Sequence, residues 1–225
     1  MVNEKKICFI ICTNDDQQLQ ECVMYLNLLH VPEGYQTDLI TVKDAVSMAA
    51  GYNEGMAASD AKYKVYLHQD TFIVEPFFLD KLIELFRGDE GIGMAGIIGA
   101  ERLPADGVMW HAKRCGNFYR LEELLESGFN DVEQTRCGLR EVEAVDGFLM
   151  ATQYDIAWRE DIFRGWDFYD ISQCMEFRRA GYKIVVPEQK ENWVIHCCTA
   201  PSLWHYEENR EIFLKEYQEI RENNL

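Results

Sequence analysis

Apolar residues in the first part of the chain alternate between short runs and segments of helical spacing. Runs of about six apolar residues are typical of buried strands, whereas apolar positions three or four residues apart are typical of helices. The alternation favours an α/β fold with a mostly parallel central sheet flanked by helices, and such sheets bind ligands beyond the carboxyl ends of their strands. The predicted strands are Lys6–Cys12, Thr37–Val42, Tyr63–His68 and Ile92–Ile98, and the predicted helices are Leu19–Leu29, Ala45–Ala58 and Pro76–Phe86.

The second part of the chain is less regular, and Pro, Gly, aromatic and charged residues are mixed over 100–130. No internal repeat and no clear linker is visible, so we expect one domain over 1–225, with halves over 1–100 and 101–200 and a final helix over 201–225. The elements expected after residue 100 are a hairpin around Met109-Trp110, a helix over Leu121–Glu126, a strand over Val142–Ala151 broken at Asp146-Gly147, a helix over Ile171–Ala180, strands over Lys183–Val186 and Trp193–His196, and an amphipathic helix over Ser202–Asn223.

Charge and composition narrow the classes of partner. The formal net charge of −17 argues against a nucleic-acid partner, because clustered Lys and Arg bind phosphate backbones. A nucleotide ligand stays compatible with this charge if a divalent cation neutralises its phosphates. No segment approaches the roughly 20 apolar residues of a membrane-spanning helix, so no transmembrane segment is expected. The 8 cysteines follow no signal peptide, which favours reduced thiols and a cytoplasmic location.

Candidate metal ligands stand at the end of the third predicted strand, in His68-Gln69-Asp70. Side chains alternate along an extended chain, so His68 and Asp70 are expected on one side and Gln69 on the other. Carboxylate oxygen suits Mg²⁺ and Mn²⁺, and Mn²⁺ accepts imidazole more readily. Taken alone, the three residues fit better with a polar strand end that binds only water.

Two further segments carry candidate chemistry. The Asp146-Gly147 pair lies among apolar residues, where it is either a bulge that admits a ligand to the backbone or a plain hairpin turn. Asp170 is expected at or near the N-cap of a helix, where its role is either capping or proton abstraction from a hydroxyl. Asp167 is a second, weaker candidate base.

The order and spacing of these segments resemble the family 2 glycosyltransferases from Ile7 to about Cys198. The His-Gln-Asp variant is similar to a bacterial subgroup related to StrF-type domains of streptomycin biosynthesis. Two positions depart from the family pattern: His68 stands where the metal motif begins with an acid, and Tyr169 stands where Glu precedes the catalytic Asp. The matching segments are Thr13-Asn14, Asp44, Asn53-Glu54-Gly55, His68-Gln69-Asp70, Asp146-Gly147, Tyr169-Asp170, Arg178-Arg179-Ala180-Gly181-Tyr182 and His196.

The resemblance implies a GT-A-like fold. It also implies an inverting, metal-dependent transfer of a sugar from a nucleoside-diphosphate sugar to a carbohydrate or other hydroxyl acceptor, with UDP or GDP as the nucleotide. Residues 1–100 would bind the nucleotide sugar, and 101–200 would lie on the acceptor side. The implied roles are base for Asp170 or Asp167; donor contacts for Thr13, Asn14, Asp44, Asn53 and Gln69; acceptor contacts for Trp110, Asp146 and Gly147; and Mn²⁺ or Mg²⁺ ligation for Asp70, His68 and His196.

Three other functions fit parts of the sequence. A sugar nucleotidyltransferase shares the fold type, but the loop Thr13–Asp16 lacks the Gly, Lys and Arg that cradle a triphosphate. A non-catalytic nucleotide-sugar or carbohydrate-binding domain is supported by the change to His68. A zinc site built from His196, Cys197 and Cys198 is disfavoured, because adjacent residues rarely share one tetrahedral ion.

Overall fold

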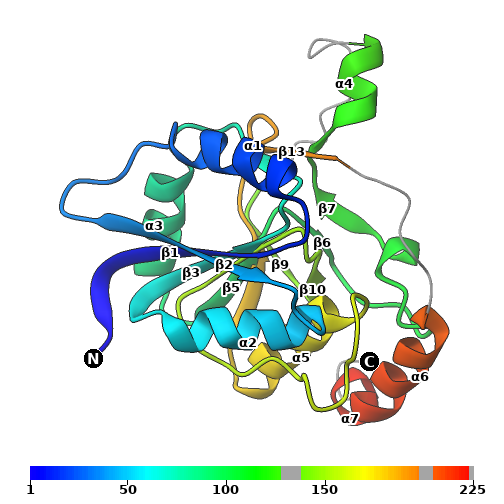
Figure 1. Ribbon diagram of the computed structural model, residues 1–225. Helices are drawn as coiled ribbons and strands as arrows, with labels where there is room; N and C mark the ends of the chain where they lie inside the picture. Colours follow the sequence, from blue (N-terminus) through cyan, green and yellow to red (C-terminus); the bar gives the residue numbers. More distant parts are fainter. Residues whose placement is uncertain (128–137, 198–204, 223–225) are drawn as a thin grey trace.

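The computed structural model describes residues 1–127, 138–197 and 205–222, and its first part follows the predicted alternation of strands and helices (Figure 1). The polar turn after the first strand is a helix start, because the Asp15 side chain accepts from the backbone N–H groups of Gln17 and Gln18. The elements are β1 (Asn3–Thr13), α1 (Asp16–Leu26), β2 (Gln36–Lys43), α2 (Met48–Ala58), β3 (Ala61–Leu67), β4 (Thr71–Ile73), α3 (Phe78–Gly88) and β5 (Ile92–Gly96).

Several elements after α3 differ from the prediction. The segment Met109–His111 is a 3₁₀ turn within the long connection between two antiparallel strands, Ile98–Ala100 and Arg114–Gly116, where a short hairpin was predicted. The strand predicted over Ile92–Ile98 is two strands in different sheets. The strand predicted over Val142–Ala151 is also divided, because Asp146-Gly147 turns the chain out of one sheet and into another. The elements are β6 (Ile98–Ala100), η1 (Met109–His111), β7 (Arg114–Gly116), β8 (Tyr119–Arg120), α4 (Leu121–Ser127), β9 (Arg140–Val142), β10 (Ala144–Val145), β11 (Leu149–Thr152), α5 (Tyr169–Arg179), β12 (Lys183–Val186), β13 (Val194–His196), α6 (Tyr206–Glu216) and α7 (Gln218–Glu222).

A seven-stranded sheet in the order β2-β1-β3-β11-β5-β12-β9 forms the centre of the molecule. The pairs β1–β2, β1–β3 and β5–β12 are parallel, whereas β11 runs antiparallel to both of its neighbours and β9 antiparallel to β12. The predicted α/β architecture with a mostly parallel sheet is therefore confirmed, with two antiparallel strands that the alternation pattern did not indicate. Two smaller sheets, β10-β6-β7 and β4-β13-β8, flank the centre.

Helices cover both faces of the central sheet because its strands are apolar on both sides (Figure 1). Along β1, Ile7, Phe9 and Ile11 join a buried cluster with α1 and α3. The alternate residues Cys8 and Ile10 join a second cluster with α2 and α5. The two clusters pack the central sheet between its helix layers.

The C-terminal segment is two helices where one was predicted. Phe213 and Tyr217 are fully buried against the cluster that contains α5, and Glu216 accepts hydrogen bonds from Arg159 and Arg179. The predicted positions Ser202, Trp204 and Asn223 lie outside the described residues. Across the described ranges, the helices are too short or too polar to cross a membrane.

Candidate functional site

The candidate site consists of two adjoining cavities, and the larger of these two opens where three parallel strands end. Thr13 is the last residue of β1, Asp44 directly follows β2 and His68 directly follows β3. The cavity has a volume of about 790 Å³, within the range of small-molecule sites. Its lining includes Cys12, Thr13, Asn14, Asp15, Asp44, His68, Gln69, Asp70 and Trp166.

Gln69 fixes the loop that forms one wall of the larger cavity. Its Oε1 accepts from Thr13 Oγ1 at 2.7 Å, from the Asn14 N–H at 3.0 Å and from the Asp15 N–H at 3.1 Å. Its Nε2 donates to Asn14 Oδ1 at 2.7 Å. A single side chain therefore joins the β3–β4 turn to the β1–α1 loop across the cavity edge.

Asp44 adopts a left-handed backbone conformation with φ of 55°. Asp tolerates this region better than most residues, and the turn leads directly to Ser47, whose hydroxyl accepts from the Ala50 N–H at the start of α2. The helix begins at Met48, three residues later than predicted, and leaves Asp44 exposed in the cavity lining.

A cluster of possible metal ligands lies beside the larger cavity. One ligand atom each from His68, Asp70 and His196 lie within 4.8 Å of one another. Asp70 Oδ1 is 3.4 Å from His196 Nε2 and 4.0 Å from His68 Nδ1. The residues meet because β13 pairs with β4, and the Cys197 N–H donates to the Asp70 carbonyl at 3.0 Å.

His68 and Asp70 do lie together, but the predicted reason, the alternation of side chains along a strand, was wrong. Residues 68–70 form a turn, closed by a hydrogen bond from the Thr71 N–H to the His68 carbonyl, and strand alternation does not apply to them. Two imidazoles and one carboxylate are a chemically suitable set for a divalent cation, and suit Mn²⁺ better than Mg²⁺. Cys197 does not belong to this cluster, and Cys198 lies outside the described residues.

Burial and neighbouring charge change the pKa values within the cluster. Burial, reinforced by His196, lowers the pKa of His68 to about 4, so its ring is neutral at pH 7. Burial alone would raise the pKa of Asp70, but the hydrogen bond and charge of His196, with a smaller effect of His68, bring it below its ordinary value. A neutral imidazole beside an ionised carboxylate is the protonation state that a metal ligand set requires.

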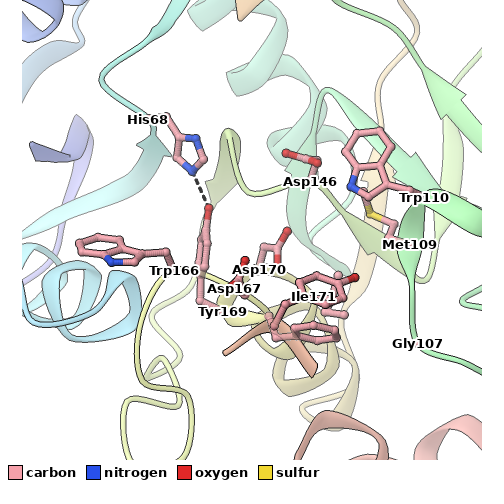
Figure 2. Close-up of a pocket in the computed structure, with 12 residues that line it drawn as sticks. His68, Gly107, Met109, Trp110, Asp146, Trp166, Asp167, Tyr169, Asp170 and Ile171 are labelled. Carbon is pink, nitrogen blue, oxygen red and sulfur yellow. Dashed lines mark hydrogen bonds between the residues drawn. The ribbon is translucent and has the colours of Figure 1, made fainter. Parts of the chain in front are cut away.

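A smaller cavity of about 170 Å³ lies on the other side of His68. Figure 2 shows Trp166 and Trp110 on opposite sides of it, with Asp146 and Asp170 between them. Both tryptophans are substantially exposed, at 55% and 44%. The remaining lining includes Gly107, Met109, Asp167, Phe168, Tyr169, Ile171 and Tyr206.

Asp170 lies in the first turn of α5 and not at the N-cap, which is Phe168. Its Oδ2 accepts a hydrogen bond of 3.1 Å from the Gly147 N–H. Gly147 is required there because a Cβ would overlap the Tyr169 hydroxyl and lie 2.9 Å from Asp170 Cβ. The Asp-Gly pair is thus a turn between β10 and β11 that admits the start of α5.

The acids of the smaller cavity are poorly solvated. Burial, with the charge of Asp146 as a second cause, raises the pKa of Asp170 to about 7. Burial also raises the pKa of Asp146 and that of Asp167. A carboxyl group with a pKa near 7 is well matched to proton abstraction at neutral pH.

The two cavities adjoin, since His68 and Trp166 line both of them. Asp70 belongs to the larger cavity and Asp170 to the smaller. A ligand extending from one cavity to the other would therefore pass the metal-ligand cluster on one side and Asp170 on the other.

Two predicted contact residues line neither cavity: Gly147, whose N–H is bonded to Asp170, and Asn53, whose side chain holds a loop. The Asn53 amide donates to the Trp158 carbonyl and to Glu160, and accepts from the Trp158 N–H at 2.8 Å. It lines neither cavity, because these bonds hold its side chain against the loop before α5. We therefore omit Asn53 from the donor site.

Sequence reasoning assigned no site role to Trp166 or to Tyr169, although both stand beside the predicted acids Asp167 and Asp170. Their position next to a candidate acid was the feature of the sequence that could have indicated a site role. Tyr206, from α6, gave no such signal because only the tertiary structure brings it to the cavity.

Comparisons with known proteins agree with this architecture. A model of a glycosyltransferase-like family matches residues 8–217. A comparison with curated proteins finds no match. Among solved structures, S. aureus TarS 1–349 in complex with UDP-GlcNAc is similar with a TM-score of 0.57 and 11% identity, over 88% of this chain and 60% of that chain.

Two further TarS structures are similar to the chain. One TarS structure gives a TM-score of 0.59 and 12% identity, over 94% of this chain and 39% of that chain. TarS 1–349 in complex with UDP gives a TM-score of 0.53 and 10% identity, over 86% of this chain and 61% of that chain. The chain thus spans less than two thirds of these TarS chains, and identities this low show the fold alone.

A sheet of this topology, with cavities at the carboxyl ends of its strands, defines a GT-A-like α/β protein. Because the family model covers most of its length, the chain belongs to the glycosyltransferase-like family. The prediction that the chain belongs to a family of glycosyltransferase type is confirmed.

Proposed function

We propose that this protein transfers a sugar from a nucleoside-diphosphate sugar to a hydroxyl acceptor, with the help of a divalent cation and with inversion at the anomeric carbon. The observation that carries the proposal is the junction of the two cavities at His68 and Trp166. It would present the donor's anomeric carbon to Asp170 while its diphosphate stays near Asp70.

The larger cavity is the proposed donor site. Its volume suits a nucleotide, and Thr13, Asn14, Asp44 and Gln69 supply hydrogen-bonding groups along its lining. UDP is the first nucleotide to test, since the similar TarS structures contain UDP-GlcNAc and UDP. GDP is the second.

The cation would be held by Asp70, His68 and His196, whose ligand atoms already converge. When bound, it would neutralise negative charge on the departing diphosphate. The net charge of −17 makes this contribution important, because an acidic protein otherwise repels a diphosphate.

The smaller cavity is the proposed acceptor site. The acceptor hydroxyl gives its proton to the Asp170 carboxylate and its oxygen bonds to the anomeric carbon, while the bond from that carbon to the diphosphate oxygen breaks and the diphosphate leaves with the electron pair. The attack comes from the face opposite the leaving group, which inverts the configuration. Trp110 and Trp166 offer faces on which a sugar ring can stack.

Three broader expectations belong to the same proposal. We propose that the two halves act as one domain, because His68 and Asp170 come from different halves of one site. We propose a cytoplasmic location, because the six described cysteines are free thiols. The relation to StrF-type domains stays a prediction from the sequence.

The proposal is tested with a panel of nucleotide sugars in thermal-shift assays with and without Mn²⁺, followed by an assay for released nucleoside diphosphate. We expect a Mn²⁺-dependent shift with a UDP- or GDP-sugar that Asp70→Ala abolishes, and release of the diphosphate when an acceptor is present. NMR of the product reports the anomeric configuration. Binding without release under any acceptor would favour a non-catalytic binding domain, and a shift with CTP or GTP and a sugar phosphate would favour a nucleotidyltransferase.

A further inference from the structure

Tyr169 connects the helix that carries Asp170 to the metal-ligand cluster. It is the first residue of α5 and its side chain is buried, with its ring against those of Tyr52 and Trp158. Its hydroxyl forms a hydrogen bond of 2.5 Å with His68 Nε2, drawn as the dashed line in Figure 2. The bond joins residues that are 101 positions apart in the sequence.

The two ring nitrogens of His68 therefore have different surroundings. Nε2 is occupied by Tyr169, whereas Nδ1 points toward the cluster, 4.0 Å from Asp70 Oδ1. The same Asp70 oxygen is 3.4 Å from His196 Nε2. A cation held by all three residues would have to meet His68 at Nδ1.

A neutral imidazole carries one proton, so only one of its nitrogens can offer a lone pair to a cation. Which of the two nitrogens offers the lone pair is set by the hydrogen bond that the other nitrogen makes to a neighbouring group. If Nε2 carries the proton and donates it to the Tyr169 oxygen, Nδ1 is left with its lone pair directed at the cluster.

We infer that Tyr169 is a positioning residue for the cation site, which holds His68 in the tautomer and ring orientation that let Nδ1 ligate the metal. The inference rests on the metal dependence proposed above. The space for the hydroxyl comes from Gly147, where a Cβ would overlap it.

This arrangement also links the proposed cation site to the proposed base. Tyr169 orients a cation ligand, and the next residue, Asp170, receives the Gly147 hydrogen bond that fixes the proposed base. One turn of α5 thus sets the position of the base relative to the cation site.

The direct test measures the affinity of the full chain for Mn²⁺ alone by isothermal titration calorimetry. Tyr169→Phe keeps the buried ring and removes the hydroxyl. We expect its Kd for Mn²⁺ to rise about 10- to 100-fold, the usual effect of losing an outer-shell partner of a ligating histidine. The melting temperature without metal reports whether the fold is kept.

Tyr52→Phe is the matched control. Tyr52 is fully buried beside Tyr169, and its hydroxyl has no hydrogen-bond partner within the described part of the chain. Its Kd for Mn²⁺ is expected to stay within about twofold of wild type, because no ligand of the proposed site is oriented by that hydroxyl.

The outcomes separate this inference from the proposed function. If wild type binds Mn²⁺ and Tyr169→Phe binds it equally well, the positioning role is wrong and the metal site stands. If wild type does not bind Mn²⁺ at millimolar concentration, the proposed metal dependence fails and the inference fails with it. Equal weakening in Tyr52→Phe would also overturn the role, since the effect would then follow from general repacking.

A second measurement reads the tautomer of His68 in the wild-type protein itself. Nitrogen-15 NMR of the wild-type histidine rings at pH 7 distinguishes the two neutral tautomers of His68, assigned by comparison with His68→Gln. We expect the proton on Nε2. A proton on Nδ1 in the metal-free protein would contradict the inference.

Discussion

The backbone N–H of Gly147 donates a hydrogen bond of 3.1 Å to Asp170 Oδ2. The donor belongs to the turn between β10 and β11, and the acceptor to the first turn of α5. The bond fixes the carboxylate that is proposed to take the acceptor proton, and it leaves Oδ1 free of this constraint.

Asp170→Asn is expected to lower kcat about 10²- to 10⁴-fold, because the amide cannot accept the hydroxyl proton. The Kd for the nucleotide is expected to change little, since Asp170 does not line the larger cavity. Steady-state kinetics and calorimetry with UDP measure the two effects separately. Asp167→Asn is the comparison, because Asp167 lines the same cavity, and a larger loss in that variant would move the base to Asp167.

The pH dependence of kcat/KM follows from the pKa of Asp170, which burial and then the charge of Asp146 raise to about 7. The base acts in its ionised form, so activity is expected to increase as pH rises and to level off above about 7. Asp146→Asn removes the neighbouring negative charge, and should shift the acid limb to lower pH while burial keeps the pKa above its ordinary value. An unchanged limb in that variant would show that another group controls it.

Gly147→Ala is expected to destabilise the fold by about 1–3 kcal/mol, the typical cost of forcing an extra methyl group into a packed site. The added Cβ would lie 2.6 Å from Tyr169 Cζ and 2.9 Å from Asp170 Cβ, so the start of α5 must move. Urea unfolding measures the loss. Gly88→Ala is the control, since no neighbouring atom lies within 4 Å of a Cβ there, and equal destabilisation of both variants would exclude the steric explanation.

Gln69→Ala is expected to weaken UDP binding about tenfold. The change leaves Thr13 Oγ1 and the N–H groups of Asn14 and Asp15 without their common acceptor, and each lost hydrogen bond costs about 1 kcal/mol. Calorimetry with UDP tests this, with Gln20→Ala on the exposed side of α1 as the control. Wild-type affinity in Gln69→Ala would mean that the β1–α1 loop holds its shape without this side chain.

The pattern of apolar positions was sufficient to predict the strand and helix alternation of the first part of the chain and the sheet edge where the candidate site lies. Periodicity is a local property, and the continuous apolar run of β1 predicts two buried faces wherever the strand lies. Thr13, Asp44 and His68 could be assigned to one edge for the same reason, because each stands where a parallel strand ends.

Which residues meet at that edge depends on contacts between segments that are distant in the sequence. The insertion of β11 between β3 and β5, the pairing of β13 with β4 that brings His196 to Asp70, and the bond between Tyr169 and His68 each join segments far apart in the chain. Asn53 shows the converse, since a motif position that suggested a ligand contact is used to hold a loop. Local patterns encode which face a residue presents, whereas packing of the whole core decides what that face meets.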